Sequence, residues 1–150
     1  MRTYTASITT SAFTAARTLV FVEAPATMAL IVIGAGVTAA ANDTNQQLEL
    51  SLDSIATPGS PTGTSITPGQ YSVGDPASSV TALGNITASE PTYSGNPSDL
   101  QGASSLGGYR FEPGLGGPQV PPSKAIGLQL EANMGTSSTL TAWIKFVEIG

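Results

Sequence analysis

The sequence predicts an all-β protein: an antiparallel, eight-stranded, jelly-roll-like β-sandwich with long Gly/Pro-rich loops. Apolar and polar residues alternate over several strand-length segments, the pattern of strands with one buried face. No segment of ten or more residues carries an apolar stripe with helical period. Of the 11 prolines and 17 glycines, ten prolines and twelve glycines lie in a loop-rich zone at about 57–122. A length of 150 residues suits a single sandwich domain, 1–150.

Four strands are expected before the loop-rich zone. Residues 2–9 alternate between apolar side chains and Thr or Ser. Residues 18–23 and 28–37 contain continuous apolar runs, which are typical of strands buried on both faces. Residues 46–53 carry a leucine at every second position, separated by polar residues. These leucines are therefore expected to point into the core.

Four more strands are expected in and after the loop-rich zone. Two short ones lie inside it, at 78–86 and 107–112, and two longer ones follow, at 124–132 and 138–149. The last two segments again alternate between apolar and polar residues. The alternation predicts a core that contains Leu48, Leu50, Leu52, Ile126, Leu128, Leu130, Ile144 and Phe146.

The composition excludes much catalytic chemistry. The chain has no Cys and no His, so it offers no thiolate nucleophile, no imidazole base and no zinc site built from those ligands. No two of the ten carboxylates lie within three positions of each other, and no serine-nucleophile motif occurs. We therefore expect no catalytic residue, no metal site and no enzymatic activity.

The charge pattern excludes two classes of partner. The net charge is −5, and no two of the five basic residues are adjacent. Binding to a phosphate backbone or an anionic membrane needs clustered cations. The uncharged stretch 24–41 is interrupted by Thr and Gly, and its apolar centre is only of strand length, too short to span a bilayer. No nucleic-acid or membrane partner is expected.

Residues 33–39 match the pattern G-x-G-x-x-A after a β-branched run, which is the fingerprint of a dinucleotide-binding loop. That loop requires a helix after the glycines, whose N-terminus holds the pyrophosphate. Here a turn cluster follows within a few residues. We therefore expect no cofactor, and expect Gly34 and Gly36 to bend or bulge a long strand.

The few aromatic residues are the candidates for contact with a partner, because exposed aromatic side chains are typical of interfaces. Several lie in the loop-rich zone, where a small core cannot easily use them all. Trp143 lies on the face of its strand opposite the buried residues, where it is either exposed or covered by a long loop. The interface candidates are Tyr4, Tyr71, Tyr93, Tyr109, Phe111 and Trp143.

The order of these segments resembles a family of capsid decoration, or cement, proteins of tailed bacteriophages. The resemblance covers most of the chain and departs from the family pattern in residues 85–122. It rests on strand and turn residues at 4–6, 11–20, 28–37, 45–50, 66–68, 74–77 and 140–150.

The resemblance implies a non-enzymatic structural protein of the virion, bound to the capsid exterior and stabilising contacts between capsomers. Its implied partners are the major capsid protein and further copies of itself, with a trimer favoured because capsid lattices offer three-fold positions. Two alternatives stay open. One is a neck, tail or fibre-associated component, and the other is a carbohydrate-binding β-sandwich that uses loop tyrosines and Trp143 for stacking.

Overall fold

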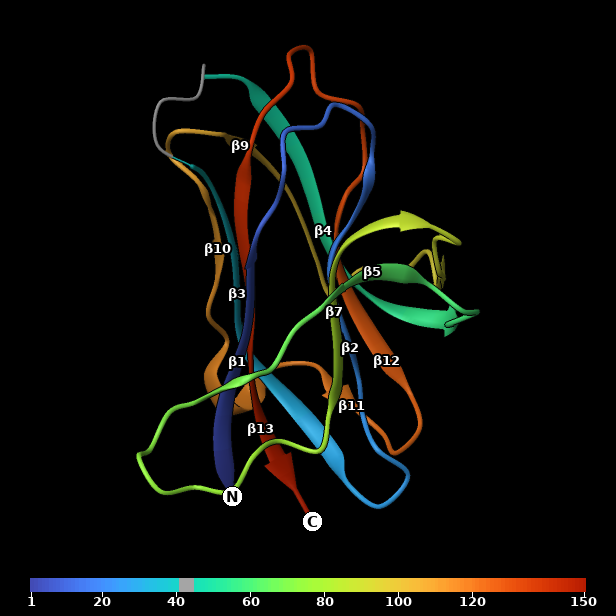
Figure 1. The fold of residues 1–150 in the computed structure, drawn as a ribbon, viewed down its shortest axis with the longest axis vertical. Helices are drawn as coiled ribbons and strands as arrows, with labels where there is room; N and C mark the ends of the chain where they lie inside the picture. Colours follow the sequence, from blue (N-terminus) through green and yellow to red (C-terminus); the bar gives the residue numbers. More distant parts are fainter. Residues whose placement is uncertain (41–44) are drawn as a thin grey trace.

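The computed structural model describes residues 1–40 and 45–150, which form an all-β fold of two antiparallel sheets packed face to face (Figure 1). The described residues contain thirteen strands and a single 3₁₀ turn, Gly114–Gly116, but no α-helix. The strands of the first sheet, sheet I, are β1 (Arg2–Thr9), β3 (Ala29–Ala39), β6 (Gly69–Gln70), β10 (Tyr109–Phe111), β11 (Gln119–Val120) and β13 (Leu140–Ile149). The strands of the second sheet, sheet II, are β2 (Arg17–Glu23), β4 (Gln47–Thr57), β5 (Thr62–Ser65), β7 (Thr81–Ala88), β8 (Thr92–Tyr93), β9 (Asp99–Ser104) and β12 (Ala125–Leu130).

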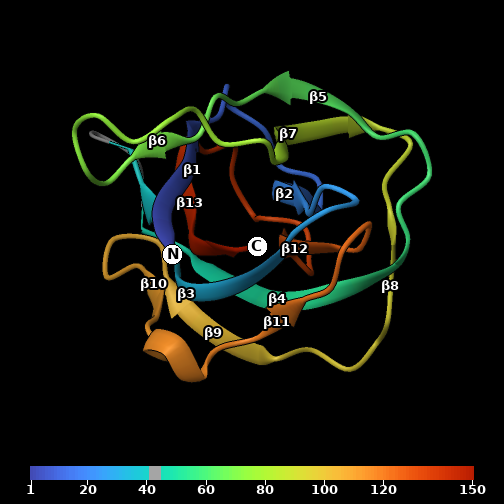
Figure 2. The same cartoon turned by 90° about the horizontal axis from the view of Figure 1, so that it is seen from below.

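Each sheet is built around one strand from the C-terminal part of the chain. Sheet I has the order β10-β3-β13-β1-β6, with β11 also paired to β3. Sheet II has the order β5-β7-β2-β12-β4-β8, with β9 also paired to β4. The central strands β13 and β12 are thus held on both sides by strands from the first 57 residues. Figure 2 looks along the sandwich and shows β1, β13 and β3 on one side and β2 and β12 on the other.

The eight expected strands are all present, but the expected count of eight is wrong. Five further strands, β5, β6, β8, β9 and β11, lie in the zone at 57–122. Four of them have two to four residues, too short to give a pattern. The longest, β9, pairs with β4 over six residues. Its sequence, DLQGAS, contains Gly and no β-branched residue, so it lacks the composition by which strands are recognised.

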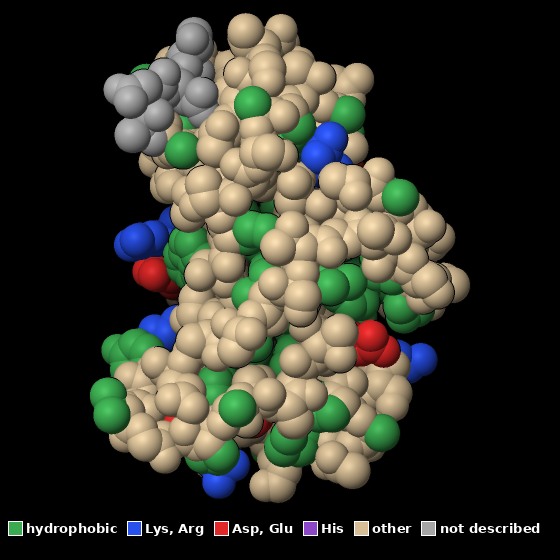
Figure 3. All heavy atoms as spheres, viewed as in Figure 1, with side chains coloured by type: hydrophobic (Ala, Val, Ile, Leu, Met, Phe, Trp, Pro, Cys, Tyr) green, Lys and Arg blue, Asp and Glu red, His purple; other side chains and the backbone are tan. Residues whose placement is uncertain are grey.

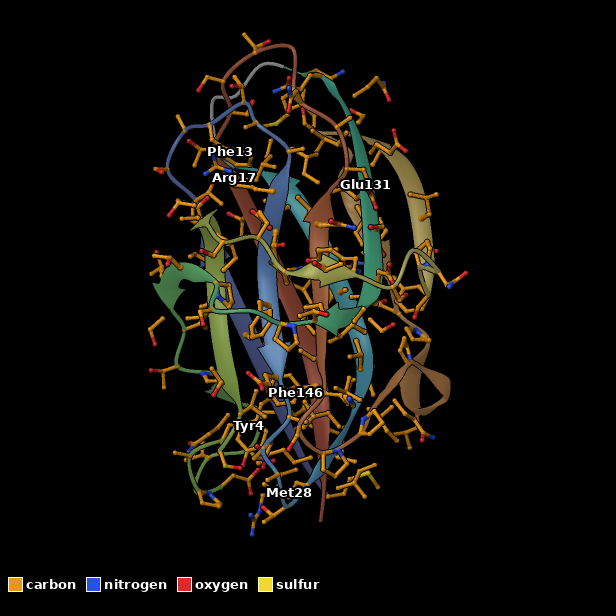
Figure 4. The ribbon with its side chains drawn as sticks, turned by 90° about the vertical axis from the view of Figure 1, so that its right-hand side faces the viewer. Tyr4, Phe13, Arg17, Met28, Glu131 and Phe146 are labelled. Carbon is orange, nitrogen blue, oxygen red and sulfur yellow. The ribbon has the colours of Figure 1, made fainter. Side chains whose placement is uncertain are left out.

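The core between the sheets confirms the expected alternation. The eight residues predicted to be buried are all at most 2% exposed. They belong to one apolar cluster with residues from both sheets. Within it Tyr4 stacks on Phe146, with ring centroids 5.9 Å apart (Figure 4). Burial of this continuous apolar surface is the main force that holds the two sheets together.

The zone at 57–122 is more ordered than its Gly/Pro content predicts. β5 and β7 extend sheet II beyond β2, while β6 adds to the edge of sheet I beside β1. Ile66, between β5 and β6, packs against the core. The backbone of Gly63 lies so close to Gly84 that a Cβ atom on Gly63 would be 2.7 Å from the Gly84 carbonyl oxygen. Glycine here serves close strand packing as well as turns.

Candidate functional site

The structure does not bring the six aromatic interface candidates together, and Tyr4 is a core residue. Its side chain is 0% exposed. Besides stacking on Phe146, its hydroxyl donates a hydrogen bond of 2.9 Å to the carbonyl oxygen of Pro76. That bond ties the segment after β6 to β1. The expectation that Tyr4 contacts a partner is therefore wrong. Its hydroxyl bonds a carbonyl oxygen within the same chain, and the sequence around Tyr4 does not reveal that acceptor.

Tyr109 and Phe111 also face inward. Tyr109 is 3% exposed, and its hydroxyl donates a hydrogen bond of 2.8 Å to Asp99 Oδ2. Phe111 is half-buried and packs against the core cluster. Both residues lie on β10, which pairs with β3 and so places alternate side chains in the sandwich. Neither residue is available as an exposed aromatic anchor.

Tyr93 anchors a segment on the outer face of sheet II. Its ring lies over Gly127 of β12, where a Cβ atom would be 2.2 Å from the Tyr93 hydroxyl oxygen. The hydroxyl is 2.7 Å from Thr18 Oγ1, and the Thr18 hydroxyl also bonds the carboxylate of Glu90. The half-buried ring is thereby committed to holding residues 90–93 against the sheet.

Tyr71 and Trp143 both lie on the outer side of sheet I. Tyr71 is 69% exposed, and the Lys145 ammonium sits 4.2 Å from the centre of its ring. Trp143 is half-buried because its indole lies on the backbone of β3. A Cβ atom on Gly36 would be 2.6 Å from Trp143 Cε2, and one on Gly34 would be 3.1 Å from Cζ3.

The same contacts explain the G-x-G-x-x-A pattern. β3 continues through both glycines to Ala39, so a strand stands where a dinucleotide-binding loop requires a helix. The expected bulge is confirmed: Lys145 pairs with Gly34 while Phe146 pairs with Val32, which leaves Ile33 as the extra residue. The further reason for the glycines, room for the indole, comes from a residue far along the chain.

The row of paired residues that crosses sheet I at Trp143 has a polar residue at each end. In the strand register Ser7 of β1 lies opposite Trp143, and Arg110 of β10 lies opposite Gly36. Thr9 and Thr141 form the next row, with their hydroxyl oxygens 2.9 Å apart. We call this surface the indole platform; its residues are Thr5, Ser7, Thr9, Arg110, Thr141, Trp143 and Lys145.

One end of the sandwich exposes large apolar side chains. Both chain ends and the loop after β6 lie at this end (Figure 1). Tyr71 is 69%, Val73 106% and Ile149 43% exposed, and the Tyr71 amide bonds the Thr3 carbonyl at 3.0 Å, which holds the loop against β1. We call this surface, with Met1, the terminal end. Figure 3 shows how few Lys, Arg, Asp and Glu side chains lie on the face of the molecule turned to the viewer.

A groove of about 470 Å³ on the outer face of sheet II is lined by Glu49, Asp53 and Glu131 among others. Asp53 accepts hydrogen bonds from Ser94 Oγ at 2.5 Å and from the Gly95 amide at 3.0 Å. Glu131 accepts one from Gln129 at 2.9 Å. Within the described part of the chain, no group of three or more carboxylates is arranged to hold a metal ion.

Tyrosines whose pKa is raised in the folded protein make the stability of the fold sensitive to alkaline pH, and the largest effects are those on Tyr93 and Tyr109. Burial raises the pKa of Tyr93 and of Tyr109 above the usual value of about 10, and the hydrogen bond to Asp99 raises that of Tyr109 further. Above about pH 10 the unfolded chain releases protons that the folded chain keeps. The contribution of these tyrosines to the free energy of unfolding is therefore expected to be constant up to that pH and to fall above it.

Urea unfolding at pH 8 to 11.5 measures this effect. A Tyr93→Phe/Tyr109→Phe double variant lacks the two hydroxyl groups that would titrate. Its free energy of unfolding is therefore expected to fall less steeply above pH 10. Equal slopes for the variant and the unmodified chain would contradict the assignment of the pH dependence to these two residues.

Searches against protein-family models, curated proteins and solved structures returned no match. In the residues that the structure describes, no helix is long and apolar enough to cross a membrane. The class defined by the structure is thus an all-β sandwich with two surfaces suited to contact, the terminal end and the indole platform.

Proposed function

We propose that the protein is a non-enzymatic virion structural protein, bound to the outer surface of a bacteriophage capsid, where it stabilises contacts between capsomers. The observation that carries this proposal is the terminal end, where Tyr71, Val73 and Ile149 are exposed around the chain ends. Exposed apolar side chains gathered on one surface are typical of a site of contact with another protein. The major capsid protein is the proposed partner.

We also propose that the fold is a jelly roll, in which eight strands form two four-stranded sheets in the orders 6-3-8-1 and 2-7-4-5. Sheet I contains β10-β3-β13-β1 and sheet II contains β2-β12-β4-β9. When β5 to β8 and β11 are left out, the other eight strands can be numbered 1 to 8 along the chain. Sheet I then has the order 6-3-8-1 and sheet II the order 2-7-4-5. On this interpretation β5 to β8 are an insertion between the fourth and fifth strands. Jelly rolls are a common architecture of viral capsid proteins.

The charge of the chain supports the exterior side of the capsid. A net charge of −5 is unfavourable beside packaged DNA, which repels an acidic protein, but is compatible with an outer surface. Its carboxylates are spread over the chain. The Lys and Arg residues are also scattered along the chain. Among the described residues, Arg110 and Glu112 form an exposed ion pair with an N–O distance of 3.8 Å.

A homotrimer is the proposed assembly. A trimer that contacts several capsomers through three copies of one weak site gains affinity, because the second and third contacts are intramolecular. Closed cyclic symmetry satisfies all three copies equally. Light scattering on the purified protein is expected to give three times the chain mass of 15.1 kDa.

The test is the addition of purified protein to capsids that lack it, with bound copies counted by quantitative mass spectrometry and located by electron cryomicroscopy. Hundreds of copies on the outer wall are expected. Val73→Asp places a charge in the proposed contact and is expected to lower occupancy at least tenfold, without a change in melting temperature, because the side chain is fully exposed.

Leu115→Asp is the matched control, since Leu115 is also an exposed apolar residue, 60% exposed, but lies in the 3₁₀ turn beside β3. It is expected to bind capsids normally. A dozen copies or fewer would favour a neck, tail or fibre position. Normal occupancy by Val73→Asp, or a location on the inner wall, would refute the proposed contact.

A further inference from the structure

The indole platform contains one aromatic ring laid along a glycine floor. Atoms from both rings of Trp143 lie over the two glycines: Cε2, Cζ2 and Nε1 within 2.7 Å of a Cβ position on Gly36, and Cζ3 and Cη2 within 3.4 Å of one on Gly34. The long axis of the indole therefore follows β3. One π face rests on the strand, and the opposite face is directed away from the sheet.

The position of the ring is held by the sheet itself. Trp143 lies on β13, the central strand of sheet I, which pairs with β1 over eight residues and with β3 over ten. A side chain on a central strand, seated against backbone, has little freedom to move. The platform is therefore a preformed surface, and a ligand that stacks on it does not have to order a loop.

Short hydroxyl side chains lie on the same face of sheet I, on β13 itself and on β1, the strand on the side of β13 away from the indole. Ser7 lies directly opposite Trp143 on β1, and Thr5 and Thr9 flank Ser7 on the same face. Thr141 flanks the indole on its own strand, and Arg110, with its side chain 71% exposed, ends the row on β10. These groups are hydrogen-bond donors and acceptors on the same face of the sheet as the apolar ring.

This pattern fits a sugar better than a protein partner. A protein interface of ordinary size has several apolar residues in its centre. Apart from Tyr71 at one end, the large apolar side chains exposed in the described residues lie elsewhere: Met1, Val73 and Ile149 at the terminal end, and Leu100, Leu106 and Leu115 on and after β9. One flat ring on a sheet face that otherwise carries hydroxyls matches a pyranose, which has apolar C–H faces and hydroxyls at its rim.

We propose that the indole platform binds a neutral polysaccharide by stacking a gluco-configured pyranose ring on Trp143. In this configuration the hydroxyls are equatorial, so both faces of the ring present only C–H groups and the hydroxyls point sideways. They are thereby directed along the sheet, toward Thr141 and the β1 hydroxyls on one side and toward the Arg110 guanidinium, a hydrogen-bond donor at the edge of the sheet, on the other. This activity goes beyond the proposed capsid role and does not depend on it.

Titration with cellohexaose tests the proposal. Trp143 is the only tryptophan of the chain, so stacking is expected to change the intrinsic fluorescence in a saturable way. In calorimetric titrations, Trp143→Ala is expected to weaken cellohexaose binding about tenfold or more, because the stacked indole supplies most of the apolar contact with the sugar. Arg110→Ala changes an exposed side chain, and it is expected to weaken binding severalfold while the melting temperature stays the same.

Leu115→Ala is the control and is expected to bind as the unmodified chain does. The proposal is overturned if neither calorimetry nor saturation-transfer NMR detects binding of cellohexaose, or if Arg110→Ala and Trp143→Ala both bind it normally. Loss of capsid binding in Arg110→Ala without any glycan binding would also overturn it, because the platform would then be a protein interface. Val73→Asp separates the two proposals: it is expected to lose capsids and to keep cellohexaose.

Discussion

Leu128→Ala is expected to lower the free energy of unfolding by about 2–5 kcal/mol, the range for truncating a fully buried leucine. Leu128 is 0% exposed and lies on β12, between Val20 of β2 and Leu52 of β4. Its side chain points into the core between the sheets, so truncation removes apolar contacts and leaves a cavity that close packing prevents from collapsing. Urea unfolding followed by circular dichroism measures the change.

Gln129→Ala is the matched control, because Gln129 is the next residue of the same strand and faces the outer groove. It loses one partly exposed hydrogen bond to Glu131, so an effect below about 1 kcal/mol is expected. A near-neutral Leu128→Ala with a costly Gln129→Ala would mean that β12 presents the opposite face to the core.

Gly36→Ala is expected to destabilise the protein by about 1–3 kcal/mol, the cost of overpacking a filled site. A Gly→Ala change ordinarily stabilises a compatible site by roughly 0.4–1 kcal/mol, because it restricts the unfolded chain. At Gly36 the new methyl group would lie 2.6 Å from Trp143 Cε2, so the indole must move off the strand. A red shift of the Trp143 emission is expected together with the loss of stability.

A double-mutant cycle tests whether the indole is the cause. In a Trp143→Ala background there is no ring above Gly36, so adding Gly36→Ala is expected to cost little or nothing. Gly135→Ala, where a Cβ atom would meet no neighbour within 4 Å, is the control for the general effect of the change. An equal cost of Gly36→Ala in both backgrounds would show that the steric contact with Trp143 is not responsible.

The alternating leucines of β4 and β12 show what a local pattern predicts well. Side chains of a strand point to opposite faces with a period of two, so Leu48, Leu50 and Leu52 identify the buried face without knowledge of any partner strand. The same alternation places Tyr4 on one face of β1 with Ala6 and Ile8, and Tyr4 is buried as that pattern implies; only its assignment to an interface was wrong. The error was to treat an aromatic residue with a polar tip as an interface residue, because its acceptor, the Pro76 carbonyl, is distant in the sequence.

The number of strands was the second failure. β5, β6 and β11 are held by pairing with β7, β1 and β3, and β9 is held by β4. Three of them have only two to four residues, and the longer β9 contains Gly and no β-branched residue, so none carries a strand pattern of its own. Backbone hydrogen bonds to an existing sheet edge make such segments into strands, and that edge is created only when the sheets assemble.

The all-β class, the eight expected strands, the buried faces of the alternating strands and the lack of Cys and His chemistry were determined by the sequence alone, because composition and two-residue periodicity are local properties. The tertiary structure decided which aromatic residues are exposed, why Gly34 and Gly36 are glycines, and where the contact surfaces lie. Gly36 and Trp143 meet only because β3 and β13 are neighbours in sheet I. Contacts of this kind depend on strand order and register, which arise from packing across the whole chain and leave no signal within either segment.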